Sequence, residues 1–386
     1  MAKRRLSLRD RVARQNETHA AVAKKARASA TDGPIIIPAK KPLQKDYTIR
    51  RAIISDIHGN FSALNAVIVD CYGNKVNEIW DLGDNIGYYA ETIRVAKAVK
   101  KGRAILRDET KTVVYEAPLR SCKGNHEELA ELARLGMQPM GLRGIGVNMD
   151  AAKSIVIAAG QLRTGKEMNE LEQCLYTLPE TIRICPEALG IHGFKQIETS
   201  WDGEQKEEMK YVLPTQLIEE YGITKRELCV DPEKIIRDAN LFADGITRVY
   251  TGHTHFSWAI ILDENGKIIA DFIIPLGEKI RTIPEIQLKP GQRLLLSPGS
   301  VGIPRNKDDQ VLDAAESRGY KLQPAQYAIE EETMRAGRKS VKVKFMEIYY
   351  KYENSERIAL EAGMPQPNPY KKEKRKKDSE AGANGK

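Results

Sequence analysis

Short apolar runs and amphipathic segments alternate along the first two thirds of the chain. Apolar runs that end at polar, glycine-containing turns have the length of buried strands. Stretches with apolar residues every three or four positions have the spacing of helices that pack on one face. The alternation predicts an α/β fold, with strands starting at Arg51 and at 76–82, 188–191 and 247–251, and helices at 62–70, 92–101, 127–136, 151–159, 166–176 and 232–242.

The last third changes to a pattern that is typical of antiparallel strands. Apolar segments at 258–262 and 267–274 flank a turn in which Asn265 and Gly266 favour a hairpin. The alternation of apolar and polar residues continues beyond this hairpin. We expect further strands at 293–296, 326–330 and 341–350, followed by a helix at 355–362.

Length and charge divide the chain into three parts. Its 386 residues suit one large α/β domain with insertions and tails. The first 46 residues hold twelve Lys or Arg against four acids, and the last 16 hold seven against three. We predict a basic, disordered arm at 1–46, a catalytic domain at 47–365 with insertions near 103–118 and 195–235, and a basic, disordered tail at 366–386.

The basic arm has two interpretations. It is either a solubilising, loosely attached tail or a contact to nucleic acid or another polyanion, because Lys and Arg gain affinity from neutralising phosphates. The sequence alone leaves both open, and it also leaves the oligomeric state open.

Several function classes are excluded by composition. No apolar run approaches the ~20 residues that a membrane-spanning helix needs, and the basic N-terminus lacks the apolar segment of a secretory signal. Five scattered cysteines without a C-x-x-C pair argue against a disulfide framework and a zinc ribbon. We expect a cytoplasmic protein that contacts no membrane and whose cysteines are small buried residues.

Metal-type ligands follow the predicted strands, each beside a glycine. Asp56 and His58 leave the first strand side by side, because residues i and i+2 share a face. Ligand sites in open α/β sheets lie beyond the carboxyl ends of the strands, where residues distant in sequence converge. Five of the six histidines occur in these segments, which random placement would seldom produce. The candidate ligands are Asp56, His58, Asp84, Asn125, His192, His253 and His255.

This ligand set restricts the metal. A mixture of carboxylate, imidazole and amide groups without thiolate suits Mn²⁺, Fe or Zn²⁺ better than Ca²⁺ or an iron–sulfur cluster. Six or seven ligands are too many for one ion. The usual arrangement is two divalent ions about 3.5–4 Å apart, which hold the attacking and leaving oxygens of a displacement at phosphorus. We expect two divalent cations, with Mn²⁺ as the first choice.

The order of these motifs resembles the calcineurin-like metallophosphoesterase superfamily. The resemblance rests on Asp-x-His at 56–58, Gly-Asp at 83–84, Gly-Asn-His-Glu at 124–127, His-Gly at 192–193 and Gly-His-x-His at 252–255. Two later runs, at 297–305 and 360–365, are similar to the bacterial and archaeal branch of small phosphodiesterases. The resemblance covers roughly residues 50–365 and leaves both tails unexplained.

The resemblance implies a fold and a mechanism. The fold would be a sandwich of two mixed β-sheets with helices on the outside. One metal would be held by Asp56, His58, Asp84 and His255, and the other by Asp84, Asn125, His192 and His253. A hydroxide that bridges the metals would attack phosphorus. His126 would protonate the departing oxygen as general acid.

Two departures from related phosphatases bear on the substrate. Eukaryotic-type Ser/Thr phosphatases continue Gly-Asp with Asp-Arg-Gly and place an Arg before Gly-Asn-His-Glu. This chain has Asn85-Ile86-Gly87 and Lys123 there, so the guanidinium groups that hold a phosphomonoester dianion and the acid that orients the general acid are both missing. This favours a phosphodiester substrate, such as a nucleotide derivative or a nucleic-acid end.

Two alternatives stay open at this point. The first is a Ser/Thr-type protein phosphatase or a small-molecule phosphomonoesterase, which uses the same metal ligands. The second is a non-catalytic binding scaffold whose basic tails make the contacts. Scaffolds derived from hydrolases usually lose ligands, whereas every ligand position here is filled.

Overall fold

A computed structural model of the chain describes residues 46–163, 165–199, 205–210, 236, 240–273, 285–305 and 322–365. The predicted arm, except its last residue, and the predicted tail lie outside the described residues. So do most of the predicted insertion at 195–235 and most of the helix expected at 232–242. No helix in the described part is long and apolar enough to cross a membrane.

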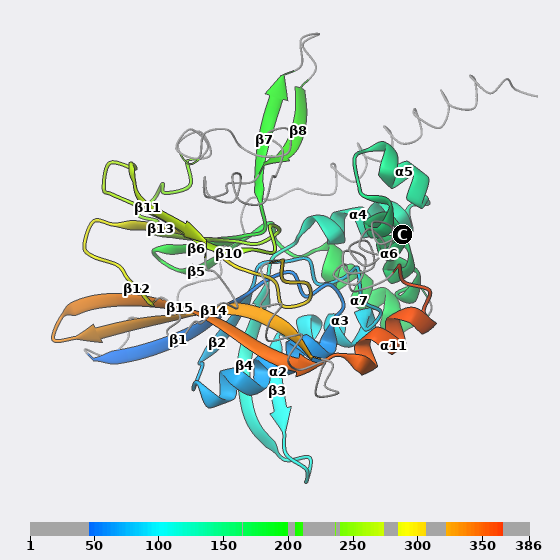
Figure 1. The fold of residues 1–386 in the computed structure, drawn as a ribbon, viewed down its shortest axis with the longest axis horizontal. Coiled ribbons are helices and arrows are strands. Elements are labelled where there is room, and N and C mark those ends of the chain that lie inside the picture. Colours follow the sequence, from blue (N-terminus) through cyan, green and yellow to red (C-terminus); the bar gives the residue numbers. More distant parts are fainter. Residues whose placement is uncertain are drawn as a thin grey trace, which may run out of the picture.

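Two mixed sheets form the centre of the described structure (Figure 1). The first has the order β12 (Glu285–Gln287), β15 (Arg338–Lys351), β14 (Leu322–Arg335), β1 (Tyr47–Ile54), β2 (Glu78–Asp81), β4 (Val113–Ser121), β3 (Arg103–Arg107). The second has the order β11 (Ile268–Ile273), β10 (Ser257–Leu262), β13 (Arg293–Pro298), β9 (Arg248–Thr251), β6 (Ala188–Ile191), β5 (Thr181–Cys185).

The two sheets pack face to face. Ile53 and Trp80 of the first sheet share a buried apolar cluster with Tyr250, Leu294 and Leu296 of the second. Alternate residues of β1 point the other way, because successive side chains of a strand face opposite sides. Burial on both faces explains why the end of β1, Ala52-Ile53-Ile54, is apolar without interruption. The two-sheet sandwich that the motifs implied is therefore confirmed.

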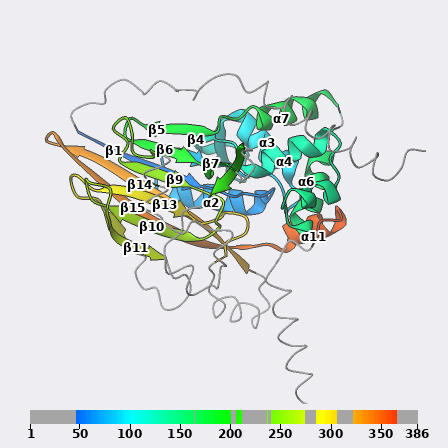
Figure 2. The same cartoon turned by 90° about the horizontal axis from the view of Figure 1, so that it is seen from above.

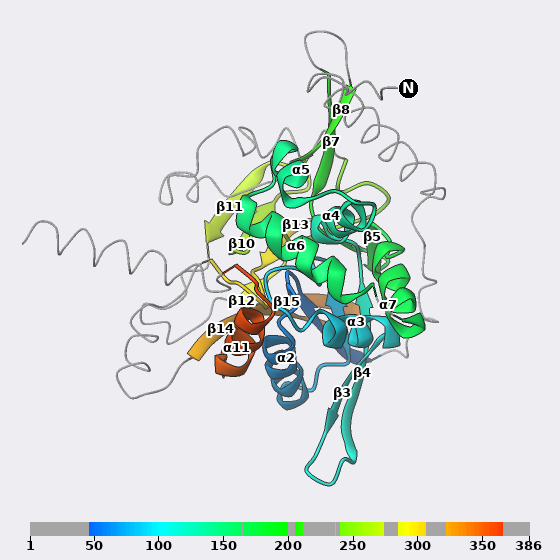
Figure 3. The ribbon, with the colours of Figure 1, turned by 90° about the vertical axis from the view of Figure 1, so that its right-hand side faces the viewer.

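Helices cover the outer face of the seven-stranded sheet (Figure 2). Leu64 and Val67 of α2 (Phe61–Gly73) share a core with Ala52 and Ile54 of β1. The predicted helical spacings correspond to α3 (Thr92–Lys101), α4 (Asn125–Arg134), α6 (Met149–Gln161), α7 (Lys166–Tyr176) and α11 (Glu353–Glu361). The short helix α5 (Pro139–Gly144) was not anticipated. Helices α4 to α7 gather at one end of the sandwich (Figure 3).

Two hairpins differ from the expected pattern. Residues 103–118, which look irregular in sequence, form most of the hairpin β3–β4 at the edge of the first sheet. Part of the predicted insertion near 195–235 contributes to the hairpin β7 (Phe194–Thr199) and β8 (Gln205–Lys210). Both hairpins project from the sandwich in Figure 1. Much of the β3–β4 hairpin is exposed, so its sequence lacks the apolar alternation of a core strand.

Parallel strands place the candidate ligands. In the first sheet β1, β2 and β4 are parallel neighbours, and in the second sheet β6 and β9 are parallel neighbours. The carboxyl ends of parallel neighbours lie at one edge of a sheet. The two sets of carboxyl ends meet at the end of the sandwich where α4 begins.

Candidate metal centre

The structure brings all eight predicted site residues together. Asp56 and His58 follow β1, Asp84 follows β2, and Asn125 and His126 open α4 after β4. From the second sheet, His192 follows β6, and His253 and His255 follow β9. Each segment is thus a strand followed at once by ligand-type side chains, as the sequence predicted.

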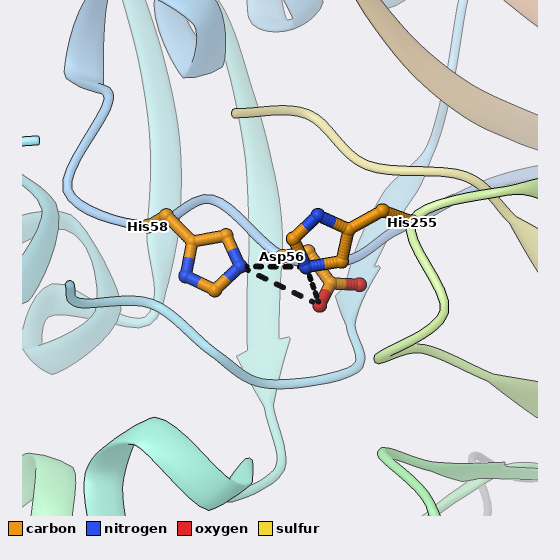
Figure 4. A group of neighbouring side chains, drawn as sticks. All are labelled: Asp56, His58 and His255. Atoms are coloured by element: carbon orange, nitrogen blue, oxygen red, sulfur yellow. Dashed lines mark hydrogen bonds and ion pairs between the residues drawn. The ribbon is translucent and has the colours of Figure 1, made fainter. Parts of the chain in front are cut away.

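One group of side chains centres on Asp56 (Figure 4). Its Oδ1 lies 3.3 Å from Nε2 of His255 and 3.7 Å from Nε2 of His58. The two Nε2 atoms lie 2.9 Å apart. All three side chains are buried. This group contains a carboxylate and two imidazoles that face one point.

A second group centres on His192. Its Nε2 lies 3.4 Å from Asp84 Oδ2, 3.0 Å from Asn125 Oδ1 and 3.3 Å from His253 Nδ1. The Asn125 oxygen also lies 2.7 Å from His253 Nδ1. Amide, carboxylate and imidazole atoms therefore converge here as well.

Asp84 lies between the two groups. Its Oδ2 is 3.4 Å from Nε2 of His192 and 3.9 Å from Nε2 of His58. The same oxygen is 3.8 Å from Nε2 of His126. A carboxylate that faces both groups is suited to bridge two cations.

The residues fit a pair of metal ions. Three overlapping sets of ligand atoms, Asp56–His58–His255, His58–Asp84–His126 and Asp84–His192–His253, each lie within 4.8 Å. The buried Oδ1 of Asp56 has no hydrogen-bond donor in the described part of the chain. Because a buried carboxylate oxygen without a partner is costly, a cation is the partner that this atom lacks.

Main-chain carbonyl groups orient the imidazoles. His58 and His126 both donate from Nδ1 to the carbonyl oxygen of Ile86, at 3.3 and 3.0 Å. His192 donates from Nδ1 to Leu82 at 2.8 Å. His255 donates from Nδ1 to the carbonyl oxygen of Ile303 at 2.9 Å. These bonds leave Nε2 of each ring facing the centre, as in the outer hydrogen bonds of metal-binding histidines.

Comparison with known protein families identifies the chain. The family model of calcineurin-like phosphoesterases matches residues 49–257. The chain belongs to this family. Residues 49–257 contain every segment of the site, from Asp56 to His255, so the resemblance seen in the motifs is confirmed. No curated protein matches the chain.

The chain is also similar to several solved structures. A metallophosphoesterase from Sphaerobacter thermophilus is 24% identical, with 83% of this chain and 96% of that chain covered and a TM-score of 0.48. A predicted phosphoesterase from Streptococcus pneumoniae TIGR4 is 12% identical over 79% of this chain and 99% of that chain, with a TM-score of 0.24. A purple acid phosphatase from yellow lupin (Lupinus luteus) seeds is 10% identical over 82% and 53%, with a TM-score of 0.29.

The calcineurin-like phosphoesterases are metal-dependent hydrolases of phosphoric esters, and this chain carries a buried cluster of His and Asp side chains where such a centre is expected. The family and the cluster together indicate a dinuclear site for divalent ions.

Burial and charge set the protonation of these groups. Burial, reinforced by neighbouring imidazoles, holds the pKa values of His58 and His253 well below the usual value, which keeps both neutral. Burial opposes ionisation of Asp56, but the His255 imidazole outweighs it and holds the pKa of Asp56 below its usual range. Burial also opposes protonation of His192, but Asp84 raises its pKa to about 10. A cation at His192 would therefore displace a proton.

The backbone is strained at the ligands. Of the ten non-glycine residues with positive φ in the described ranges, five are Asp56 (57°), His58 (53°), Asp84 (57°), His253 (70°) and His255 (60°). Such angles are uncommon outside glycine and collect at functional sites. The left-handed turns send the side chains of a strand end into the space between the two sheets.

Close contact with neighbouring segments explains why two positions beside the ligands are glycine. A Cβ at Gly124 would lie 2.2 Å from Oδ1 of Asp84, and a Cβ at Gly252 would lie 2.0 Å from Oγ of Ser55. No side chain fits in either space. The Gly-Asn-His-Glu and Gly-His-x-His motifs thus require glycine because neighbouring strands meet there.

Sequence reasoning missed the role of Glu127. Its carboxylate accepts hydrogen bonds from the backbone N–H groups of Asp84 (3.1 Å), Asn85 (2.7 Å) and Gly124 (2.8 Å). Burial, with Asp84 nearby, raises the pKa of Glu127 to about 8. The side chain joins the β2 turn to the start of α4. Its place directly after His126 was the only signal in the sequence.

The structure shows which group orients the His126 ring in the absence of an acid. The carbonyl oxygen of Ile86, rather than a carboxylate, holds Nδ1 of His126 at 3.0 Å. Gly87 permits this contact, because a Cβ there would lie 2.3 Å from the same nitrogen. A main-chain group therefore replaces the orienting acid of related phosphatases.

Proposed function

We propose that this protein is a phosphodiesterase that acts on nucleotide or nucleic-acid type substrates with two divalent cations. The observation that carries the proposal is the convergence of seven ligand-type side chains into two groups that share Asp84. The family match supplies the general chemistry, hydrolysis of a phosphoric ester.

We assign the ligands as the motifs implied. Asp56, His58, Asp84 and His255 would hold one cation, and Asp84, Asn125, His192 and His253 the other. Nitrogen and oxygen donors without thiolate favour Mn²⁺, with Fe or Zn²⁺ as alternatives. When bound, the two cations supply Lewis-acid polarisation of the phosphoryl group and activation of water. The protein fixes their positions through its oriented imidazoles and strained strand ends.

His126 is the proposed general acid. With Nδ1 committed to Ile86, Nε2 faces the same space as Asp84 Oδ2, 3.8 Å away. Burial lowers the pKa of His126, and the Asp84 carboxylate acts in the opposite direction. A bound phosphoester would add negative charge beside the ring and favour the imidazolium. The Nε2 proton can then pass to the departing oxygen, while the Nδ1 proton stays on the ring, hydrogen-bonded to the carbonyl oxygen of Ile86.

Two residues beside the metal ligands support a diester substrate. The Tyr88 ring lies edge-on to His58, with centroids 4.8 Å apart, and 5.2 Å from the ring of His126. Arg305 is exposed, and its backbone N–H is fixed to the carbonyl oxygen of His255 at 3.0 Å. In the described part of the chain neither the phenol nor the guanidinium group has a hydrogen-bond partner. Among nearby charges, Arg305 acts most strongly on the Tyr88 phenol.

The unpaired groups suit a phosphate that carries one charge. Arg305 supplies one cation and Tyr88 one hydroxyl donor, beside the ring of the proposed acid. The positions at which related phosphatases carry arginine hold Asn85-Ile86-Gly87 and Lys123. A phosphodiester has one negative charge and an organic group on each side. One guanidinium group and one hydroxyl donor are better matched to it than to a monoester dianion.

The test compares two chromogenic substrates with the same leaving group. Protein loaded with Mn²⁺ is assayed with bis-p-nitrophenyl phosphate and with p-nitrophenyl phosphate, and its metal content is measured. We expect about two equivalents of metal and a higher kcat/KM for the diester. A strong preference for the monoester contradicts the substrate assignment. Less than one equivalent of metal, without turnover of either ester, contradicts the centre itself.

A further inference from the structure

A cavity of about 380 Å³ opens beside the metal centre. Gly124 and His192 border it at one end. It therefore begins next to one of the two ligand groups and extends away from it across the outer face of the six-stranded sheet. Its volume lies within the range of about 300–1,000 Å³ that is usual for small-molecule sites.

The walls of the cavity are aliphatic. Leu189 and Ile191 of β6 face outward on one side, because Gly190 between them points to the inner face, against Leu82 and Ile182. Leu241 and Ile246 also line the cavity, and they share a buried apolar cluster with Ile191, against which Leu189 packs. Ile191, Leu241 and Ile246 are buried, and Leu189 is half-buried. A flat apolar group would find an aliphatic surface for one of its faces here.

Lys123 lies at the inner end of the cavity. Its backbone N–H donates to the carbonyl oxygen of Pro179 at 2.7 Å, and the next residue, Gly124, is packed against Asp84. The side chain is half-buried, and its ammonium group has no ion-pair or hydrogen-bond partner among the described residues. Lys123 therefore lines the cavity on a fixed backbone, one residue before a segment of the metal centre.

The other charged residues that line the cavity include both acidic and basic side chains. Glu128, Glu180 and Asp244 line the cavity as well as Arg183, whose guanidinium donates to the carbonyl oxygens of Pro186 and Asp244. A ligand with a high charge of one sign would meet like charges here. A nucleobase instead has apolar faces and an edge of hydrogen-bond donors and acceptors, which matches aliphatic walls and a mixed polar rim.

We propose that this cavity binds the nucleoside arm of the substrate, with the base against the aliphatic surface and Lys123 beside the sugar. The proposal rests on the proposed function, because it assigns a place to one side of the diester. It adds to that function a site for the nucleoside arm.

The test uses two diesters that release the same p-nitrophenolate. One is the p-nitrophenyl ester of thymidine 5′-monophosphate, which has a nucleoside arm, and the other is methyl p-nitrophenyl phosphate, whose second arm is only a methyl group. Lys123→Ala removes the ammonium group, and Thr181→Trp fills the cavity from the half-buried position beside Ile191. Lys101→Ala, an exposed lysine at the end of α3, is the matched control.

We expect both cavity variants to lower kcat/KM about tenfold for the nucleoside ester, as for loss of a charge-assisted contact, and less than twofold for methyl p-nitrophenyl phosphate. Calorimetry with thymidine 5′-monophosphate should show a similar loss of affinity in the Mn²⁺-loaded variants. The control should match the wild type in both measurements, and thermal unfolding checks that each variant is folded.

The outcomes separate the two proposals. A wild-type protein that hydrolyses neither diester refutes the proposed function, whatever the cavity does. If the wild type hydrolyses both and the variants keep the ratio of the two substrates and the affinity for thymidine 5′-monophosphate, the cavity inference alone is overturned. An equal loss for both substrates in Lys123→Ala also overturns it, because the lysine would then act at the scissile phosphate.

Discussion

Strands β1 and β9 lead to two groups of buried charged side chains, and the two groups differ. Beyond their carboxyl ends lie Asp56, His58, His253 and His255 of the candidate metal centre. Earlier in the same strands, roughly 16 Å away at the strand rise of about 3.3 Å per residue, Arg51 and Arg248 meet between the two sheets. We call the second group the ion-pair cluster: Arg51, Arg248, Glu330 and Glu332, with the Tyr250 hydroxyl.

The ion-pair cluster is balanced within the protein. Glu330 accepts from Arg51 at 2.8 Å and from Arg248 at 2.9 Å, and the Tyr250 hydroxyl donates to it as well. Glu332 lies 3.2 Å from Arg51 and 3.3 Å from Arg248. None of these four charged residues has a positive φ. Two carboxylates and two guanidinium groups neutralise one another, so this cluster holds the sheets together without a ligand.

The metal centre is left unbalanced by comparison. Asp56 Oδ1 lacks a donor, two imidazole nitrogens face each other at 2.9 Å, and five of the ligands have left-handed backbone angles. The two groups differ in charge pairing and in backbone conformation. Opposite charges paired within the protein on regular strands indicate a structural role, whereas ligand-type side chains gathered on strained turns indicate a binding site.

The largest expected effect is at the carboxylate that faces both groups. Asp84→Asn should lower activity by roughly 10⁴-fold or more, because one residue serves both cations. Metal analysis should show loss of bound metal, and the rise in Tm that Mn²⁺ causes in the wild type should be lost. Two tightly bound metal ions in this variant would contradict the assignment.

His126→Ala tests chemistry without metal binding. We expect turnover to fall by about 10²–10⁴-fold, the usual contribution of a general acid, with both metals retained. The loss should be smallest for p-nitrophenyl esters, whose leaving group needs little protonation, and larger for alkyl esters. Equal losses for both leaving groups would argue against proton transfer from His126.

Glu330→Gln breaks the balanced cluster instead. It should lower the free energy of unfolding by about 3–5 kcal/mol, because two buried guanidinium groups lose their shared carboxylate. Denaturant unfolding measures this. Glu331→Gln is the matched control: Glu331 is the next residue, pairs with Arg50 at a partly exposed site (2.8 Å), and should change stability by less than about 1 kcal/mol. Similar values for both variants would show that the cluster does not stabilise the fold.

The same cluster predicts a pH dependence. Burial raises the pKa of Glu330, but Arg248 and Arg51 outweigh it and lower the pKa to about 2. Because the folded pKa is below the unfolded one, this stabilisation is complete above about pH 5 and is lost as the pH falls toward 2. The difference in unfolding free energy between wild type and Glu330→Gln should shrink by roughly 3 kcal/mol across that range. A constant difference would contradict the shift.

The smallest effect is expected beside the metal ligands. Arg305→Met should lower kcat/KM for bis-p-nitrophenyl phosphate about three- to tenfold and leave metal content unchanged, because the guanidinium contacts only substrate. Arg338→Met, an exposed arginine at the start of β15, is the control. Full activity in Arg305→Met would remove this residue from the proposed substrate site.

The sequence signals for the candidate centre are local. Each ligand segment follows an apolar strand and contains a glycine, so Asp56, Asp84 and His192 can be recognised as candidates from a few neighbouring residues. The contacts that orient them are not local. Ile86 meets His126 across 40 positions and Ile303 meets His255 across 48, through main-chain atoms that carry no sequence signal.

The ion-pair cluster could not be predicted for a related reason. Arg51, Arg248 and Glu330 look like solvent-facing positions of their strands, and only the stacking of the two sheets buries them. The β3–β4 hairpin was also missed, because the inward signal of β4 is limited to Ala117 and Leu119 while Val113 and Val114 are exposed. The boundaries of the basic arm and tail stay predictions.

One peptide unit links two functions of the centre. The carbonyl oxygen of Ile86 accepts hydrogen bonds from His58, a proposed ligand, and from His126, the proposed proton donor. A shift of the turn that carries Ile86 would therefore move both rings in concert and keep their mutual spacing, 4.5 Å between centroids, nearly constant. The backbone at Ile86 therefore sets the spacing between the His58 and His126 rings, so this spacing would persist when the side chains around them change.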